Sequence, residues 1–477
     1  MADPRGFLKA GRVPYPMREP SERVHDYDEI YGTLPEPELR TQAARCMDCG
    51  VPFCNNACPL GNLIPDWNDL ARTGNWRDGI DRLHATNNFP EFTGLICPAP
   101  CESACVLGID DDPVMIKQVE YWLIDHAFEQ GWVEPRPPDN RTGKTVGVIG
   151  SGPAGLAAAA ELNLVGHTVT IYERDEAAGG MLRFGVPDAK LDKRIIDRRL
   201  AVLEAEGIEL RYGVEVGVDL TVAELREHHD AILLAIGARV ERELNIPGSK
   251  LDGVHLAMSY LYQRNRAVAR ANDRVAPPAE RDPISAAGKR VVVVGGGDTG
   301  MDCLSNALRE GAADVLLLDV YPEVPSGGRY ANTPWPMQPR RLAKTYALDE
   351  GGARHFARQV TAIEGNGRVE RVCGRQVRGQ SSMDLVPVPD SEFTAPADLV
   401  LVAVGFSGTE TGPLLDDLDI GLDQPGRIRA GTFATEADGV YAAGDCRVGA
   451  SLVVTAIAEG RRCARVIDRR LRAGITS

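Results

Sequence analysis

Seven of the eleven cysteines lie between residues 46 and 105, and their spacing indicates a metal-binding role. The first four have two, four and three residues between them, and a proline follows the fourth. This is close to the ferredoxin pattern, in which the cysteine before the proline binds the other cluster. Zinc on four thiolates is the alternative, although zinc sites usually pair two C-x-x-C knuckles and this stretch has one. The seven are Cys46, Cys49, Cys54, Cys58, Cys97, Cys101 and Cys105.

Seven thiolates are too many for one zinc ion and one short of two four-thiolate iron–sulfur clusters, so an eighth ligand is needed. In the expected helix after Cys105, Glu120 falls on the same face as four apolar residues. A carboxylate in an apolar stripe normally requires a partner. Glu120 is therefore either part of a salt bridge, a side chain that leans out to water, or a ligand. The four apolar residues are Ile116, Leu123, Ile124 and Ala127.

Two segments combine a buried strand, a glycine turn and a helix, which is the pattern of a dinucleotide-binding fold. In the first, an apolar strand at 145–149 leads into Gly150-x-Gly152-x-x-Gly155, an alanine-rich helix and a second strand ending at Glu173. Gly150 allows the tight turn, Gly152 lets the backbone approach a pyrophosphate, and Gly155 lets the helix pack on the strand. Glu173 suits the hydroxyl pair of a ribose. Because all parts agree, the segment predicts a dinucleotide site.

The second segment repeats this plan after a proline-containing break. A strand at 290–294 leads into Gly295-x-Gly297-x-x-Gly300, and the next strand ends at Asp319. The alternative is a nucleotide-type domain that has lost its ligand, but the whole unit is intact. Two such folds in one chain suggest two nucleotides, one on each side of a hydride transfer.

The C-terminal stretch GVYAAGDCRVGASLVVTAIAEGRR identifies the flavin site through a resemblance. Over residues 144–477 the chain resembles the flavoprotein reductases with two dinucleotide-binding domains. The resemblance implies FAD at the first glycine turn and a nicotinamide nucleotide at the second. It also implies that Asp445 bonds the ribityl chain and that the next helix points its N-terminus at the flavin. The cofactor-binding residues expected from motifs and resemblance are Gly150, Ser151, Gly152, Pro153, Ala154, Gly155, Glu173, Arg174, Gly180, Met181, Arg183, Gly237, Gly295, Gly297, Asp298, Thr299, Gly300, Asp319, Gly444, Asp445, Leu452, Val453 and Val454.

Over essentially its full length the chain resembles the family of bacterial glutamate synthase small subunits. The same architecture occurs in the N-terminal half of dihydropyrimidine dehydrogenase and in a subunit of a ferredoxin-dependent transhydrogenase. Many reductases of the flavoprotein type carry a C-x-x-C disulfide beside the flavin, but this chain has none after residue 105. Electrons therefore need another exit. The resemblance rests on DPRGFLK, CMDCGVPFCNNACPLGNLIPDWNDL, NNFPEFTGLICPAPCESACVLGI, GGMLRFGVPDAKLDK, GGGDTGMDC and GDCRVGASLVVTAIAEGR.

This family resemblance implies two 4Fe-4S clusters with interleaved ligands. It also implies a mechanism, in which reduced nicotinamide passes hydride to FAD and single electrons leave through the clusters. They would reach a large subunit that carries FMN, a further iron–sulfur cluster and a glutaminase site. That subunit would make L-glutamate from L-glutamine and 2-oxoglutarate. One cluster would use Cys46, Cys49, Cys54 and Cys105, and the other would use Cys58, Cys97, Cys101 and Glu120.

The choice between NADPH and NADH is the least defined expectation. Asp319, at the end of the second strand, favours the free 2′-hydroxyl of NADH. Arg329, Arg340 and Arg341 could bind a 2′-phosphate if their loop folds back. Most bacterial members of the family use NADPH, so the resemblance favours NADPH narrowly, with NADH possible.

Composition restricts the class and location of the protein. The 477 residues suffice for about three domains, and the net charge of −15 argues against nucleic acid or an anionic membrane as partner. No stretch is long and apolar enough to span a bilayer, and the N-terminus has no signal peptide, so a cytoplasmic location is expected. There thiols stay reduced, which disfavours disulfides. The fold expected is α/β: an α-helical iron–sulfur domain at 1–143, an FAD-binding domain at 144–285 and 404–477, and an NAD(P)H-binding domain at 286–403, the last two Rossmann-like and of glutathione-reductase type.

Two other functions remain open at this level. A pyrimidine dehydrogenase subunit or a ferredoxin–NADP reductase would keep the electron chain and change the partner. A scaffold whose metal only braces an interaction domain would transfer no electrons, but the intact glycine motifs disfavour it. Hydride transfer requires positioning rather than an acid–base pair, so no catalytic acid or base is predicted.

Overall fold

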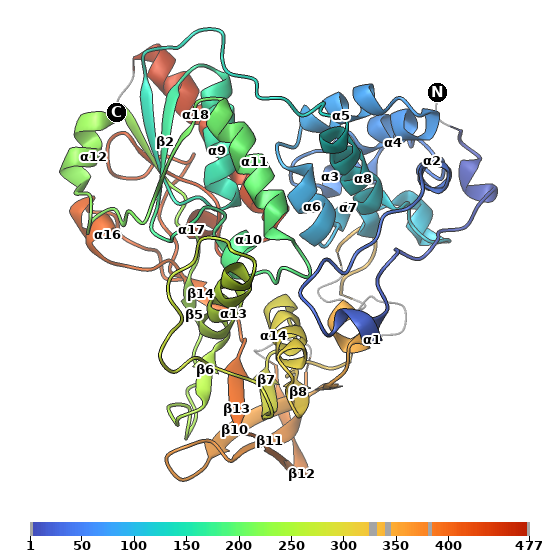
Figure 1. Cartoon of the computed structure of the whole chain (residues 1–477), viewed down its shortest axis with the longest axis vertical. Helices are drawn as coiled ribbons and strands as arrows, with labels where there is room; N and C mark the ends of the chain where they lie inside the picture. Colours follow the sequence, from blue (N-terminus) through green and yellow to red (C-terminus); the bar gives the residue numbers. More distant parts are fainter. Residues whose placement is uncertain (1–2, 324–331, 339–344, 380–383, 475–477) are drawn as a thin grey trace.

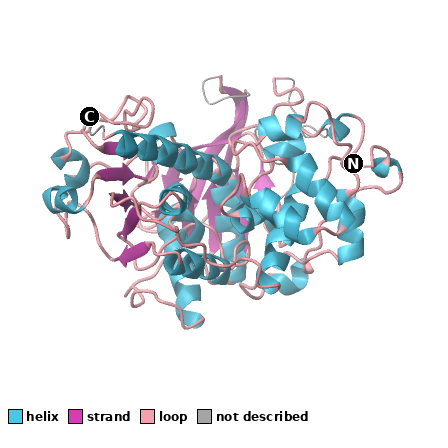
Figure 2. Cartoon of the chain, turned by 90° about the horizontal axis from the view of Figure 1, so that it is seen from above, coloured by secondary structure: helices cyan, strands magenta, loops and turns pink. Residues whose placement is uncertain are grey.

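The computed structural model describes residues 3–323, 332–338, 345–379 and 384–474. Figure 1 shows an all-helical N-terminal region beside one α/β unit, with a second α/β unit below them. Viewed from above, in Figure 2, the strands belong to the two α/β units and the N-terminal region is built of helices and loops. The predicted fold class is confirmed by this arrangement. In the part of the chain that is described, no helix is both long and apolar enough to cross a bilayer.

Prolines begin many of the helices in the N-terminal region, because a proline at the first helical position loses no internal hydrogen bond. Pro20, Pro90 and Pro100 start α1, α6 and α7. The helix that carries Glu120 buries the four predicted apolar residues, so its predicted face is confirmed. The elements are η1 (Gly6–Leu8), α1 (Pro20–Arg23), α2 (Glu36–Ala43), α3 (Phe53–Ala57), α4 (Ile64–Thr73), α5 (Trp76–His84), α6 (Pro90–Ile96), α7 (Pro100–Ser103), η2 (Val106–Ile109) and α8 (Ile116–Glu129).

The first α/β unit contains a five-stranded parallel sheet in the order β15-β4-β1-β2-β3. Its central strands are almost fully buried and apolar, as expected for a sheet covered by helices on both faces. The edge strand β15 comes from the C-terminal part of the chain, so the chain leaves this unit and returns to it. The elements are β1 (Thr145–Ile149), α9 (Pro153–Leu164), β2 (Thr168–Glu173), α10 (Met181–Phe184), α11 (Lys193–Ala205), β3 (Glu209–Tyr212), α12 (Val222–His228), β4 (Ala231–Leu234), β15 (Val440–Ala442), α17 (Asp445–Val448) and α18 (Val453–Ala473).

The second α/β unit repeats the plan with a parallel sheet in the order β6-β13-β7-β8-β9 and adds an antiparallel sheet of β10, β11 and β12. Strand β6 precedes the expected boundary at residue 285 but pairs with β13 of this sheet. The domain boundaries themselves stay predictions. The elements are β6 (Val254–Leu256), α13 (Ala257–Ala271), β7 (Arg290–Val294), α14 (Asp298–Arg309), β8 (Asp314–Leu318), α15 (Tyr346–Asp349), β9 (Ala353–His355), β10 (Arg358–Glu364), β11 (Arg371–Arg378), β12 (Val386–Pro396) and β13 (Leu399–Val402), with β5 (Val240–Glu241), β14 (Phe406–Gly408) and α16 (Pro413–Asp417) outside it.

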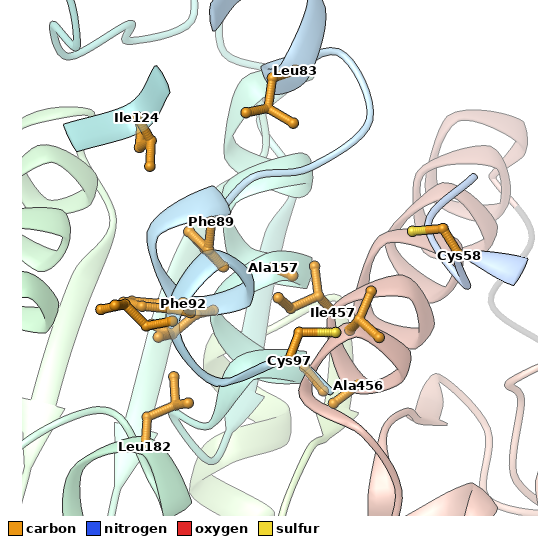
Figure 3. Packing of buried hydrophobic residues seen from close by; sticks show 14 of the residues in the cluster. Cys58, Leu83, Phe89, Phe92, Cys97, Ile124, Ala157, Leu182, Ala456 and Ile457 are labelled. Atoms are coloured by element: carbon orange, nitrogen blue, oxygen red, sulfur yellow. The ribbon is translucent and has the colours of Figure 1, made fainter. Parts of the chain in front are cut away.

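One hydrophobic core joins the helical region to the first α/β unit. Phe92 lies in α6, and Phe89 directly precedes that helix. In Figure 3 both lie in the same cluster as Ala157 of α9 and Ile457 of α18. Cys97 lies in the same cluster. Burial of shared apolar surface fixes the helical region against the first α/β unit. The cysteines of the helical region therefore lie next to that unit.

Candidate functional site

The seven predicted cysteines and Glu120 gather around two separate cavities in the helical region. Four of the cysteines line the first cavity, three of them partly buried. The second cavity is lined by buried cysteines, Glu120, Asn62 and Thr93. Cys105 joins the early cysteines and Cys58 joins the late ones, so the two groups interleave along the chain. The first cavity is lined by Cys46, Cys49, Cys54 and Cys105, and the second by Cys58, Cys97, Cys101 and Glu120.

Burial makes these thiols poor acids when they stand alone. Burial, together with neighbouring thiols, raises the pKa of Cys46, of Cys54 and of Cys97 to about 12 in each case. A thiolate is the form that binds metal, and a bound cationic centre supplies the charge that stabilises it. These thiols would therefore lose their protons when a metal centre binds.

The arrangement of these donors is too open for a single ion. Within the described ranges, no three or more His, Cys, Asp or Glu side chains are grouped so that they could hold one metal ion. Tetrahedral zinc with bonds of about 2.3 Å needs sulfur atoms only about 3.8 Å apart. Four thiolates in one set, and three thiolates with a carboxylate in the other, match the ligand number of a 4Fe-4S cluster.

Glu120 is buried on α8 and held by two neutral donors. Asn87 Nδ2 and Thr93 Oγ1 each donate to Oε1, both at 2.8 Å. Burial raises the pKa of Glu120 to about 7. No described residue forms a salt bridge with this carboxylate, and the residue is only 6% exposed, so neither alternative use of Glu120 applies. Because both hydrogen bonds end on Oε1, Oε2 is the oxygen that remains for a ligand.

A third cavity, of about 710 Å³, lies where all three parts of the chain meet. The first glycine turn forms one wall. Gly150 has φ +99°, and a Cβ there would lie 2.5 Å from Ala235 O, whereas a Cβ at Gly152 would meet open space. A backbone that faces open space at the start of α9 is suited to hold a pyrophosphate. The predicted residues that line the cavity are Gly150, Ser151, Gly152, Pro153, Ala154, Glu173, Arg174, Gly180, Met181, Gly237, Asp298, Thr299, Asp445, Leu452 and Val453.

Glu173 ends β2 with its carboxylate turned toward the glycine turn. Its Oε2 accepts the backbone N–H of Ser151 at 3.1 Å and also the Ser151 hydroxyl, while Oε1 accepts from Asp175 N at 2.9 Å. These contacts fix the acid at the cavity wall, where a ribose would bind. Arg174 beside it pairs with Glu410 at 2.7 Å.

The C-terminal wall contains Asp445 and the start of α18. Ser451 Oγ donates to Asp445 Oδ1 at 2.6 Å, and burial raises the pKa of Asp445. The first turn of α18 begins at Val453, so the free N–H groups of its N-terminus face the same cavity. A helix N-terminus stabilises negative charge nearby.

Several predicted residues do not line the large cavity. Gly155 packs inside α9 against the carbonyl of Gly150. Arg183 is buried and pairs with Asp197 at 2.5 Å. Val454 lines the second cysteine cavity instead. The remaining ones are Gly295, Gly297, Gly300, Asp319 and Gly444.

The second glycine turn repeats the first. Gly295 has φ +122° and lies against Ala403 O, while a Cβ at Gly297 would meet open space. Strand β8 ends at Leu318, one residue before the predicted end, so Asp319 directly follows it, and its carboxylate is already engaged. Oδ2 accepts from Arg354 Nη2 at 2.7 Å, and Oδ1 accepts from Tyr321 N at 3.0 Å.

Arg354, on β9, was not found from the sequence, because nothing in its neighbourhood indicates that β9 would pair beside β8. Lys190 and Asp302, which line the large cavity, were also missed, because they lie 112 residues apart and no local pattern indicates that they meet. The predicted phosphate-binding arginines Arg329, Arg340 and Arg341 lie outside the described residues.

Comparison with known families identifies the class. The pyridine nucleotide-disulphide oxidoreductase family matches residues 144–460, and dihydropyrimidine dehydrogenase domain II, 4Fe-4S cluster, matches residues 23–132. The fold resembles that of FprA from Mycobacterium tuberculosis in complex with NADPH, with a TM-score of 0.55 and 19% identity over 71% of this chain and 85% of that one. The chain is thus a pyridine nucleotide oxidoreductase with an N-terminal iron–sulfur domain.

Full-length relatives narrow this class to one family. The glutamate synthase (NADPH) small chain of Mycobacterium tuberculosis is 51% identical over 474 residues, covering 99% of this chain and 96% of the relative. The corresponding chain of Bacillus subtilis is 42% identical and covers 99% of both. The glutamate synthase (NADH) of Saccharomyces cerevisiae is 43% identical, and this chain spans 22% of it. The chain belongs to the glutamate synthase small-chain family, which confirms the resemblance.

Proposed function

We propose that this chain is the electron-input subunit of a glutamate synthase. It oxidises NADPH with FAD and passes electrons through two 4Fe-4S clusters to a large subunit. That subunit, with FMN, a further iron–sulfur cluster and a glutaminase site, makes L-glutamate from L-glutamine and 2-oxoglutarate. The observation that carries the proposal is that the three cavities adjoin in a row.

The large cavity meets the second cysteine cavity through shared backbone. Ile96 and Pro98 line the large cavity, and Cys97 between them lines the cysteine cavity. In the same way, Val453 lines the large cavity and Val454 the cysteine cavity. Adjacent residues of two backbone segments therefore line the proposed flavin site and the proposed cluster site.

The two cysteine cavities meet in turn at two apolar side chains. Ile64 and Ile116 line both of them. An apolar partition excludes water between neighbouring redox groups and keeps them close. The row supports a path from the nucleotide site to the first cysteine cavity, whose cysteines are the less buried set.

The bound groups supply the redox chemistry, because a flavin exchanges hydride for single electrons and iron–sulfur clusters carry single electrons. The chain's own residues bind and orient these groups. The two glycine turns would hold the pyrophosphates, Glu173 a ribose and Asp445 the ribityl chain. The Cys46 group and the Cys58 group with Glu120 would hold one cluster each.

NADPH is the proposed reductant. The bacterial relatives carry NADPH in their names, and the yeast relative carries NADH. Arg354 supports this choice, because its guanidinium neutralises Asp319, which would otherwise disfavour a 2′-phosphate.

An anaerobic titration of the purified chain tests the proposal. NADPH should bleach the flavin faster than NADH, and metal analysis should find about eight irons with little zinc. The Cys101→Ser variant should lose about half of the iron, whereas Cys373→Ser, on β11 away from the cavities, should lose none. One zinc per chain would contradict the cluster assignment. Failure to copurify with a glutaminase-bearing FMN subunit would favour a pyrimidine dehydrogenase or a ferredoxin–NADP reductase instead.

A further inference from the structure

The segment that precedes α2 lies against all three parts of the chain. Its two ends pair with each other, because Met17 and Tyr31 form an isolated antiparallel bridge and Arg18 N donates to Ile30 O at 2.9 Å. Residues 18–31 thus form a closed loop, which we call the strap. In Figure 1, α1, which belongs to the strap, lies beside the second α/β unit, on the side away from β5 and β14.

A buried group of charges joins the strap to the second α/β unit. Arg23 of α1 donates through Nε to Glu350 Oε1 and through Nη2 to Tyr346 O, both at 2.8 Å. The side chains of Arg23 and Glu350 are 1% and 0% exposed. Arg309 of α14 binds the same carboxylate, with Nη2 2.9 Å from Oε1, and its Nε donates to Asp26 O of the strap at 2.9 Å. The strap is therefore fixed to α14 and to α15, which Glu350 directly follows.

The strap is also attached to the other two parts of the chain. Ile30 is fully buried, and its N–H donates at 2.9 Å to Ala189 O, in the loop between α10 and α11 of the first α/β unit. Ile30 and Ala189 lie in one hydrophobic core with Met301 of α14. Glu29 accepts a hydrogen bond from the hydroxyl of Tyr121, on α8, at 3.3 Å. One short segment therefore connects the two α/β units with each other and with the helical region.

The direct connection between the two α/β units is narrow. The chain passes to the second unit after β4 and returns after β13, and the two passages pair as β5 and β14. Such a link can act as a hinge, since a few residues at the ends of elements absorb a domain rotation. On this side the stacked rings of Phe184 and Tyr262, 5.0 Å apart, also hold α13 to the first unit. On the other side the strap reaches α14 and α15, where Lys190 also pairs with Asp302, so the strap helps to set the angle between the units.

Hydride transfer depends on that angle. By the proposed function the first unit holds the flavin and the second holds the nicotinamide, so the angle sets the distance between the reacting atoms. Those atoms must lie about 3–3.5 Å apart, and a misplacement of about 1 Å can lower the rate about 100-fold. We propose that Arg23 is a positioning residue for this step, and that through Glu350 it holds the second unit at the angle that brings the nicotinamide to the flavin. The inference rests on the proposed function.

The first test compares R23M with R40M in the FAD-loaded chain. R23M removes the charge of the strap but leaves Glu350 paired with Arg309, so no buried charge loses its last partner. In anaerobic stopped-flow measurements, R23M should reduce its flavin with NADPH at a limiting rate about tenfold below the wild type, with an unchanged Kd for NADPH. R23K keeps the charge and should regain most of the rate. Arg40, on α2, is 45% exposed and lies outside the strap, so R40M should match the wild type.

Two further measurements separate positioning from damage to the fold. Dithionite reduces a flavin without the nicotinamide, so its rate should be the same in R23M and in the wild type. Hydrogen exchange of the oxidised chain needs no turnover. In R23M the amides of 18–31 should exchange faster, while those of α14 should keep their wild-type protection. Y27F removes the hydroxyl that accepts from Arg264 Nη2 at 2.8 Å, loosens the strap more mildly and should lower the rate with NADPH about threefold.

A wild-type limiting rate in FAD-loaded R23M would overturn the inference, and so would an equal slowing of the reduction by dithionite. If R23M binds no FAD, a wild-type limiting rate in Y27F would overturn it instead. A wild-type chain whose bound flavin is not reduced by NADPH would refute the proposed function itself.

Discussion

Arg354 and Asp319 form a buried ion pair at the end of the second nucleotide-binding sheet. Nη2 of the arginine lies 2.7 Å from Oδ2 of the aspartate, and the two side chains are 4% and 2% exposed. Nη2 also lies 3.2 Å from Gly296 O, in the glycine turn itself. The acid that the sequence associates with NADH is thus joined to a cation from the next strand.

Replacing Arg354 with Met should weaken the binding of NADPH more than the binding of NADH. The carboxylate of Asp319 would lose this positive neighbour and repel a 2′-phosphate. We expect KM for NADPH to rise about tenfold more than KM for NADH, equivalent to about 1.4 kcal/mol. Steady-state kinetics with an artificial electron acceptor measure both. The double variant Asp319→Asn/Arg354→Met should recover NADPH binding, and Arg371→Met, on the antiparallel sheet, should change neither value. An equal rise in KM for both nucleotides would mean that the pair of Arg354 and Asp319 has only a structural role.

Glu120→Gln should cost the chain one of its two clusters. The amide keeps the size of the side chain but is a far weaker ligand than a carboxylate. Iron should fall from about eight to about four per chain, with FAD retained. Glu129→Gln, at the exposed end of the same helix, serves as the control and should keep all the iron. A full iron content in Glu120→Gln would remove Glu120 from the ligand set.

Arg199→Met should loosen the helical region from the first α/β unit. Arg199 of α11 pairs with Glu91 of α6 at 2.5 Å, with side chains 7% and 0% exposed. Loss of one partner leaves a buried charge, which costs about 3–5 kcal/mol. Urea-induced release of FAD, followed by flavin fluorescence, should move to clearly lower urea. The exposed pair of Arg211 and Glu209 provides the comparison, because Arg211→Met should lower the stability of the fold by less than about 1 kcal/mol. Similar midpoints for the two variants would contradict the prediction.

Glu29 should make the folded state less stable as the pH rises from about 4.5 to 7. Burial, helped by the charges of Asp125 and Asp192, raises the pKa of Glu29 to about 7, although Tyr121 and Arg198 oppose the rise. Within that window the folded state holds a proton that the unfolded state has released, so stability falls with increasing pH. We expect a change on the order of 1 kcal/mol or more, since one pKa unit corresponds to about 1.36 kcal/mol. Thermal unfolding across this range measures it, and Glu29→Gln should flatten the slope. An unchanged slope in that variant would assign the effect to other groups.

The features that could be predicted from the sequence are local ones. The turn from Gly150 to Gly155 and its copy from Gly295 to Gly300 each lie within one strand–turn–helix unit, so their backbone conformation depends on neighbouring residues. The helical face around Glu120 could be predicted for the same reason, because its period is set by a single helix. The cysteine spacing indicated a metal centre, and the partition of the ligands into two sets came from the family resemblance.

The sequence by itself therefore determined the two nucleotide-binding units, the cysteine-rich helical region and the class of chemistry. Only the tertiary structure decided which charges meet: Arg354 with Asp319, Lys190 with Asp302, and the two neutral donors with Glu120. These partners lie far apart in the chain or on strands whose order no local pattern gives. Their contacts arise when apolar surfaces are buried together, and the shared core in Figure 3 is one such surface. That burial, rather than any motif, also set the three cavities in a row.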